Sequence, residues 1–89
     1  MDFFVKADSN VKRTGFSLFK NIQEKGVENI RISVVSPAAI GAAMKVIHNA
    51  NVFLAQEGRA VWAKPGYEDK LNPQGAEISV FILHLKMEQ

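Results

Sequence analysis

The sequence predicts an α+β fold, a two-layer βαβαββ sandwich in which two helices cover one face of a four-stranded mixed sheet. Two segments carry apolar residues at the spacing of an amphipathic helix, and four segments rich in β-branched and aromatic residues have the character of strands. Their order favours right-handed crossovers, which return both helices to the same side of the sheet. No connecting segment is long enough to divide the chain, so we expect a single domain over residues 1–89.

The first strand is predicted at Phe3–Lys6 and the first helix at about Val11–Lys25. A polar turn at residues 8–10 precedes this helix and supplies side chains that can cap its first turn. Gly26 supplies the helix stop. The apolar face of the helix is formed by residues at helical spacing: Val11, Gly15, Leu18, Phe19 and Ile22.

The second strand is predicted at Asn29–Val35, where Ile32 and Arg31 represent the two opposite faces of a β-branched run. Ser36 and Pro37 follow as the expected N-cap and first position of a second helix, because the hydroxyl accepts a backbone N–H and proline has none to lose. That helix ends before a turn at Glu57–Gly58. Its apolar residues again recur at helical spacing: Ile40, Ala43, Met44, Ile47 and Leu54.

The third strand is predicted at Arg59–Lys64. The segment KPGYEDKLNPQG follows it with two prolines and two glycines, which predicts an irregular, exposed hairpin loop. The last strand is predicted at Glu77–Lys86 and is apolar on both faces through Val80–Leu83, so we expect it to be central in the sheet.

One sheet face is uncovered in this arrangement. We expect aromatic and apolar side chains on or near it beside basic residues: Phe4, Trp62, Phe81 and Leu83 beside Lys6, Arg31 and Lys64. A single layer of strands that exposes such residues is typical of an interface. A homodimer contact, an error in the assigned register and a base-stacking platform are the three interpretations, and they remain open.

Composition restricts the class of protein. The chain has no cysteine, which removes disulfides, thiol nucleophiles and cysteine-based metal sites. No apolar run reaches the length of about 20 residues that a membrane span needs, and MDFFVKADS does not have the pattern of a signal peptide, so we expect a cytoplasmic protein without membrane partners. The net charge of +2 and the pI near 9.1 are mildly basic and permit a nucleic-acid partner.

A chain of 89 residues buries only roughly 60–65% of its unfolded surface, so added burial through a homodimer is expected. We place the interface on the last strand and on one side of the second helix, where small residues allow close approach. The predicted interface residues are Ala42, Val46, Ala50, Phe53 and Phe81.

Nearly the whole chain resembles the stage V sporulation protein S family, small bacterial proteins with an Alba-like fold. The resemblance lies in VKADSN, the helix ending QEKG, the strand ENIRISVV, the helix AAMKVIHNANVFLAQEG and the following AVWAKPGYE. The run GVENIRI, followed by a small-residue helix with Lys45, is more distantly similar to the archaeal chromatin protein Alba and to the C-terminal domain of a bacterial translation initiation factor.

The resemblance implies dimers that bind DNA or RNA through the loop after the first strand and through the last hairpin, here Lys6–Arg13 and Lys64–Gln74. The chain departs from the pattern in both places. Asp8 lies where Alba has adjacent lysines, and Glu68 and Asp69 partly cancel the positive charge of the hairpin. The candidate nucleic-acid-binding residues are Lys6, Lys12, Arg13, Lys64, Tyr67 and Lys70.

Lys12 and Arg13 lie at a helix start, where the dipole disfavours cations and favours an anion. A bound phosphate would account for them, and so would side chains that are solvated or that reach back to Asp8. Tyr67 either stacks on a base or is amphipathic surface.

Catalysis has little support in the sequence. His48 and His84 lack metal-ligand spacing, and no serine has the context of a nucleophile elbow. We expect no enzyme activity, no metal and no cofactor. Two function classes remain: a nucleic-acid-binding dimer that contacts backbone phosphate and acts in sporulation or development, and a regulatory or scaffold protein that acts through protein contacts.

Overall fold

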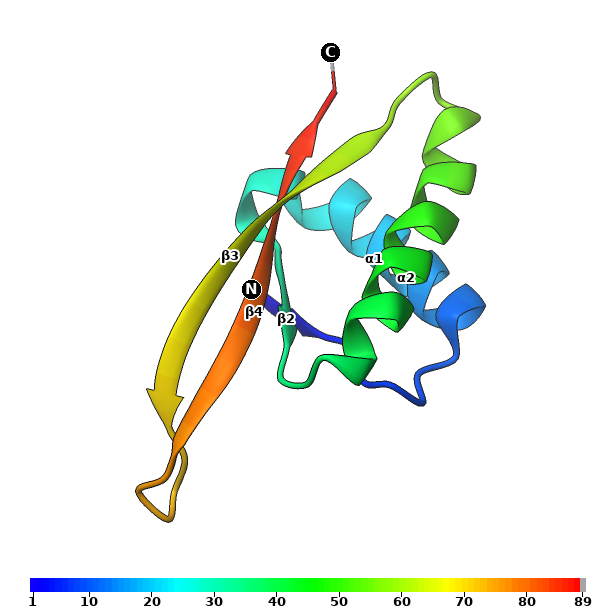
Figure 1. Cartoon of the computed structure of the whole chain (residues 1–89). Helices are drawn as coiled ribbons and strands as arrows, with labels where there is room; N and C mark the ends of the chain where they lie inside the picture. The colour runs from blue at the N-terminus through cyan, green and yellow to red at the C-terminus, as the bar shows by residue number, and fades with distance from the viewer. Residues whose placement is uncertain (89) are drawn as a thin grey trace.

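The computed structural model describes residues 1–88, and its elements follow the βαβαββ order (Figure 1). They are β1 Asp2–Phe4, α1 Val11–Lys25, the short 3₁₀ helix η1 Val27–Asn29, β2 Arg31–Val34, α2 Ala38–Ala55, β3 Val61–Leu71 and β4 Glu77–Met87. β1 and β2 are shorter than predicted. At the start of β2 the reason is η1, which ends at Asn29 and has Ile30 as its C-cap, so the strand begins at Arg31.

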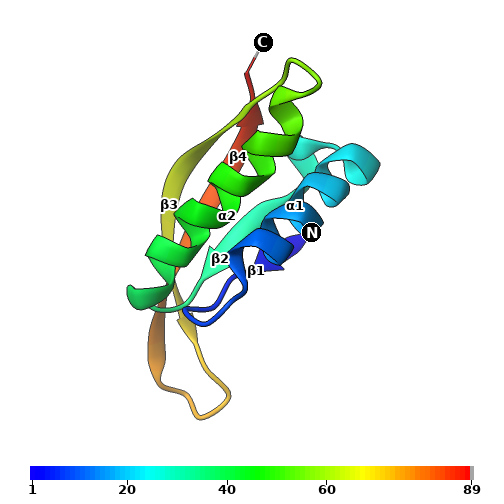
Figure 2. The same cartoon turned by 90° about the vertical axis from the view of Figure 1, so that its right-hand side faces the viewer.

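The four strands form one mixed sheet in the order β1-β2-β4-β3. β1 pairs with β2 in parallel, whereas β4 is antiparallel to both of its neighbours. Both helices lie on the same side of this sheet (Figure 2). The predicted α+β sandwich and the central position of the last strand are therefore confirmed.

α1 begins and ends as predicted. The Asn10 side chain accepts a hydrogen bond from the Arg13 backbone N–H at 3.1 Å, which satisfies one of the unpaired donors of the first turn. At the other end Gly26 has φ +83°, and its N–H donates to the Ile22 carbonyl at 3.0 Å. Glycine is suited to that left-handed conformation because it has no Cβ.

α2 begins one residue later than expected and without a side-chain cap. The Ser36 hydroxyl makes no capping bond, so that prediction is wrong. The Ser36 and Pro37 carbonyls instead accept the Ala39 and Ile40 backbone N–H groups, each at 3.1 Å, and Pro37 already has helical φ and ψ.

α2 has two buried sides, and this overturns part of the predicted dimer interface. One side faces the sheet and the other faces α1. Val46 and Ala50 are fully buried within the protomer, where their backbone lies close to Gly15 of α1. The small residues of this side therefore admit the neighbouring helix and not a second copy. Ala42 and Phe53 are half-buried against the same core.

By length and composition α2 could also cross a membrane. Its buried residues, however, lie in the hydrophobic core that the helices and the sheet share: Ala39, Ala43, Val46, Ile47, Ala50 and Leu54. It is therefore the core helix of a globular fold.

The prediction of an irregular loop after Lys64 is wrong over most of its length, because β3 continues to Leu71 through Pro65 and Gly66. The strand tolerates proline because β3 is an edge strand, and a residue that lacks an N–H can turn that side toward solvent. The turn is confined to residues 72–76, where the Asn72 side chain accepts the backbone N–H groups of Gln74 and Ala76 at 3.0 and 2.8 Å.

The pairing register also corrects the faces assigned to two residues of β4. Phe81 and Leu83 lie opposite Val34 and Ile32, on the face that the helices cover. Leu83 belongs to the core, and Phe81 is half-buried against it. Phe81 therefore does not belong to the uncovered face.

Candidate nucleic-acid interface

The uncovered side of the sheet, here called the open face, is defined by the pairing register. In a strand alternate residues share a face, and directly paired residues of neighbouring strands lie on the same face. One row across the four strands is therefore Phe4, Ser33, Ile82 and Gly66, the next is Asp2, Arg31, His84 and Lys64, and the third is Lys86 and Trp62. Phe4 and Trp62 are 65% and 62% exposed, as predicted for this face.

A ladder of ion pairs crosses part of the open face. The Arg31 guanidinium contacts Asp2 at 2.6 Å and Glu68 at 3.4 Å, and Lys70 contacts the other oxygen of Glu68 at 3.5 Å. The hydrogen bond from Arg31 lowers the pKa of the Asp2 carboxyl, and the same bond raises the pKa of Arg31. Because Glu68 pairs with Val80 and Arg31 with His84, the ladder passes over Ile82, which is almost completely buried.

This ladder decides which charges of the open face are compensated. The strand residues of the face include four cations, Arg31, Lys64, Lys70 and Lys86, and two carboxylates, Asp2 and Glu68. Both carboxylates are engaged by Arg31 and Lys70, whereas Lys64 and Lys86 form no ion pair among residues 1–88. The strand residues of the face therefore keep a net charge of +2, at Lys64 and Lys86, and Glu88 lies just beyond the end of β4.

His84 and Gly66 are packed together beside Lys64. A Cβ at Gly66 would lie 3.3 Å from His84 Nε2 and 3.5 Å from Cδ2, so the imidazole lies over the glycine backbone. An aromatic ring over a strand glycine covers backbone that would otherwise be solvated. The exposed ring of His84 thus sits between β2 and Lys64 on the same face.

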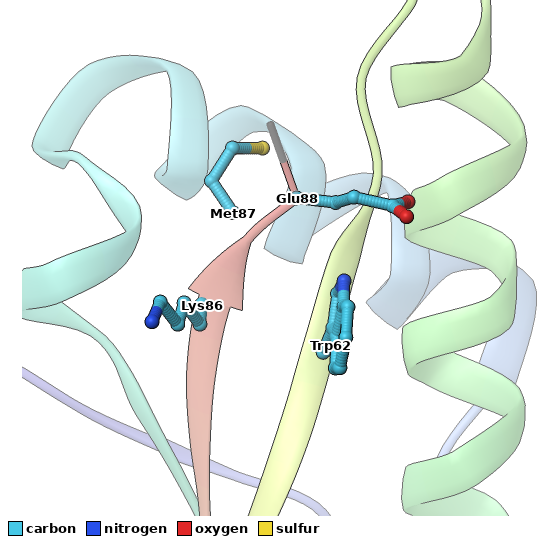
Figure 3. Close-up of a pocket in the computed structure, with 4 residues that line it drawn as sticks. All are labelled: Trp62, Lys86, Met87 and Glu88. Carbon is cyan, nitrogen blue, oxygen red and sulfur yellow. The ribbon is translucent and has the colours of Figure 1, made fainter.

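Trp62 borders a surface hollow near the end of β4. Its other lining residues are Lys86, Met87 and Glu88. In Figure 3 the Trp62 indole and the Lys86 side chain come from neighbouring strands, and the Glu88 carboxylate points to the side opposite the Lys86 ammonium. The indole has no aromatic partner among the described residues.

Lys6, Lys12 and Arg13 form a second group of cations at the start of α1. All three are exposed, and none forms an ion pair with Asp8 or with any other residue that the structure describes. The interpretation that the Lys12 and Arg13 side chains reach back to Asp8 is therefore not observed. Lys12 also lines a hollow between the two helices with Asn49 and Phe53.

Tyr67 and Lys70 belong to the hairpin, in β3 and not in a loop. Beyond the end of β2 the residues 68–80 form a two-stranded arm that projects from the sheet (Figure 1). Tyr67 lies at the base of this arm, with its ring edge-on to Phe81 at 5.3 Å and its hydroxyl 2.6 Å from Ser79 Oγ. The arm has three carboxylates, Glu68, Asp69 and Glu77, and one cation, Lys70.

The six predicted binding residues therefore do not form one patch. The start of α1 and the arm do lie at the same end of the molecule, because β1, β2 and β3 run in the same direction. Lys64 lies on the open face, away from the start of α1. The structure adds two residues that the sequence did not select, His84 and Lys86, and places them on the same face as Trp62, which was expected there. The alternation of His84 and Lys86 with apolar residues in VFILHLK was the available signal, but the strand is apolar on both faces and hides it.

No family model matches the chain, and no curated protein matches it in a sequence search. The resemblance to the stage V sporulation protein S family thus stays an interpretation of the sequence. Among residues 1–88 no three histidine or carboxylate side chains are grouped to hold a metal ion.

Proposed function

We propose that this protein binds DNA or RNA without catalysing a reaction, chiefly through contacts to backbone phosphate. The observation that supports the proposal most is the uncompensated charge of Lys64 and Lys86 on a sheet face that also exposes Trp62 and Phe4. Lysines that neutralise phosphates release condensed counterions, and this release supplies sequence-independent affinity.

Lys6, Lys12 and Arg13 offer the second group of phosphate contacts. Two cations in a first helical turn oppose the helix dipole by about 0.3–1 kcal/mol each, and a bound phosphate reverses that cost. The arm contributes less than the sequence suggested, because Lys70 is paired with Glu68 and its neighbours are acidic. A role in sporulation or development in the cytoplasm is part of the proposal and rests on the family resemblance.

Variants in which two cations are replaced by glutamine test the proposal. The affinity of labelled duplex DNA, single-stranded DNA and RNA is measured by fluorescence anisotropy for Lys64→Gln/Lys86→Gln and for Lys12→Gln/Arg13→Gln. At about 50 mM salt, each lost phosphate contact should weaken binding roughly five- to tenfold.

Lys20→Gln/Lys25→Gln is the matched control, since both residues are exposed on α1 and form no ion pair among the described residues. Its affinity should equal that of the wild type. Wild-type protein that binds none of the three probes at low salt would refute the proposed function.

The alternative function, protein contact without nucleic acid, is favoured by the outer side of the helices. Phe16, Met44 and Val52 are 46%, 53% and 50% exposed there, beside the hollow lined by Phe53. If the chain is a homodimer, we propose this side as its contact in place of the buried α2 residues. Light scattering of Met44→Asp/Val52→Asp should then give the monomer mass of 9.9 kDa, and a dimer that persists would place the contact elsewhere.

A further inference from the structure

We infer that the open face binds single-stranded nucleic acid, with an unpaired base stacked on Trp62 and its flanking phosphates held by Lys64 and Lys86. This inference rests on the proposed function and specifies its ligand and its site. It places the principal contact on the sheet, whereas the family resemblance implies the loop after β1 and the hairpin.

Trp62 has the properties that base stacking needs. Its indole is 62% exposed, it has no ring partner among the described residues, and it borders a hollow. Every base has a π-face, so an accessible aromatic ring on a rigid strand binds bases with little sequence preference. By contrast Tyr67 is engaged by Phe81 and Ser79, which limits the approach of a base to its ring.

The cations are placed to hold the backbone of a strand whose base lies on Trp62. Lys86 on β4 is paired directly with Trp62 on β3. Lys64 follows Trp62 by two residues on β3, about 7 Å along the strand. The two cations of the open face that form no ion pair are therefore both neighbours of Trp62 in the pairing register. Glu88 lines the same hollow but is directed away from Lys86 (Figure 3).

Charge favours a polyanion over a second copy of the chain on this face. A two-fold symmetric contact would bring the same patch of both subunits together. A two-fold axis at Trp62 would gather two copies each of Lys64 and Lys86 with only two copies of Glu88, and like charges in contact are unfavourable. A nucleic acid supplies both the opposite charge and the flat ring.

The ligand is a single strand because the bases of a duplex are stacked on each other and are not available to a side chain. Phe4 offers a second exposed ring on the same face. It is three strands and four residues away from Trp62, a diagonal of about 20 Å at the usual strand spacings. Lys64 and His84 lie between the two rings, so the diagonal path is lined by groups that suit a nucleic-acid backbone.

Trp62 is the only tryptophan of the chain, so its intrinsic fluorescence reports on this site alone. The protein is titrated at low salt with a short oligothymidylate and with a duplex of the same length. We expect strong quenching by the single strand and little by the duplex. In parallel, anisotropy of the labelled oligothymidylate measures binding whether or not Trp62 is involved.

Trp62→Ala should weaken oligothymidylate binding roughly 5- to 140-fold at constant salt, the range that corresponds to stacking of one base. The salt dependence of oligothymidylate binding should be the same for this variant as for the wild type, because no phosphate contact is lost. Trp62→Phe keeps a ring and should retain part of the affinity. Met44→Ala, a matched exposed site on α2, should bind like the wild type.

The outcomes separate the two proposals. Oligothymidylate binding by anisotropy without quenching, or with full affinity in folded Trp62→Ala, would overturn the stacking site and leave the proposed function standing. Quenching by the duplex as strong as by the single strand would overturn the single-strand preference. A shift of the Trp62 emission maximum with protein concentration alone, accompanied by a doubled mass in light scattering that Trp62→Ala returns to the monomer mass, would show that a second copy covers the face. No binding to any nucleic acid would overturn both proposals.

Discussion

Replacing Gly15 by alanine should destabilise the fold, although alanine is the better helix former. A Cβ at Gly15 would lie 2.5 Å from the Asn49 Cβ, 3.1 Å from the Val46 carbonyl oxygen and 3.3 Å from the Ala50 nitrogen. Carbon atoms in contact are normally about 3.5–4.0 Å apart, and none of these three atoms can move by a rotamer change. α1 and α2 must therefore separate.

The magnitude follows from three contributions. Overpacking of this kind costs about 1–3 kcal/mol, with the upper end expected for contacts to backbone atoms. Separation of the helices also stretches the 3.0 Å bond from the Asn49 amide to the Val11 carbonyl, worth about 1 kcal/mol. The higher helix propensity of alanine returns about 1 kcal/mol. The net loss of about 2–3 kcal/mol corresponds to a decrease in Tm of at least roughly 8 °C.

Gly41→Ala is the matched control, because it makes the same change in α2 where a Cβ would meet nothing within 4 Å. It should raise stability by about 0.5–1 kcal/mol. Thermal unfolding by circular dichroism and urea unfolding give both values. Equal stabilisation by the two substitutions would refute the close contact between α1 and α2.

Four further predictions concern single interactions. Asn51→Ala removes two hydrogen bonds to the Val61 backbone, at 2.8 and 3.2 Å, and should lower the free energy of unfolding by about 1–3 kcal/mol in urea titrations. Arg31 lowers the pKa of Asp2 in the folded state, so this pair stabilises the fold at pH values above the ordinary carboxyl pKa. The stabilisation is lost as the pH falls below about 4. Asp2→Asn should therefore show a smaller difference between the urea midpoints at neutral and at acid pH than the wild type. Glu68→Gln removes one carboxylate from the open face and frees Lys70, while Arg31 stays paired with Asp2, so it should tighten oligonucleotide binding in anisotropy titrations; unchanged affinity would show that the ladder lies outside the binding surface. Chelation with EDTA should leave Tm unchanged, and a decrease of several degrees would reveal a metal that contributes to folding.

The sequence predicted the element order, the bounds of α1 and the central strand because each depends on local periodicity. Hydrophobic spacing alone placed Gly15 on the buried face of α1, and the structure shows why a glycine stands there. The extent of β3 was missed because Pro65 and Gly66 are local turn signals, and only the pairing with β4 at a sheet edge overrides them.

The sequence predicted less well which face of each helix or strand is buried. α2 has two apolar sides, and the sequence does not show that the second one belongs to α1 and not to another subunit, so Val46 and Ala50 were misassigned. β4 is apolar on both faces, which placed Phe81 on the wrong side and hid Lys86. The neutralisation of Arg31 by residues of β1 and β3 depends on register alone, and no sequence pattern indicates it.

The salt dependence of single-strand binding tests the central claim most directly. Association constants for oligothymidylate are measured by anisotropy over a range of salt concentrations for the wild type and for Lys64→Gln/Lys86→Gln. We predict a linear decrease of log K with log salt for the wild type, and a slope less steep by roughly 1.4 units in the variant, since each phosphate contact to a single strand contributes about 0.7. Equal slopes for the two proteins would contradict phosphate binding by the open face, and wild-type protein that does not bind at low salt would contradict a nucleic-acid function altogether.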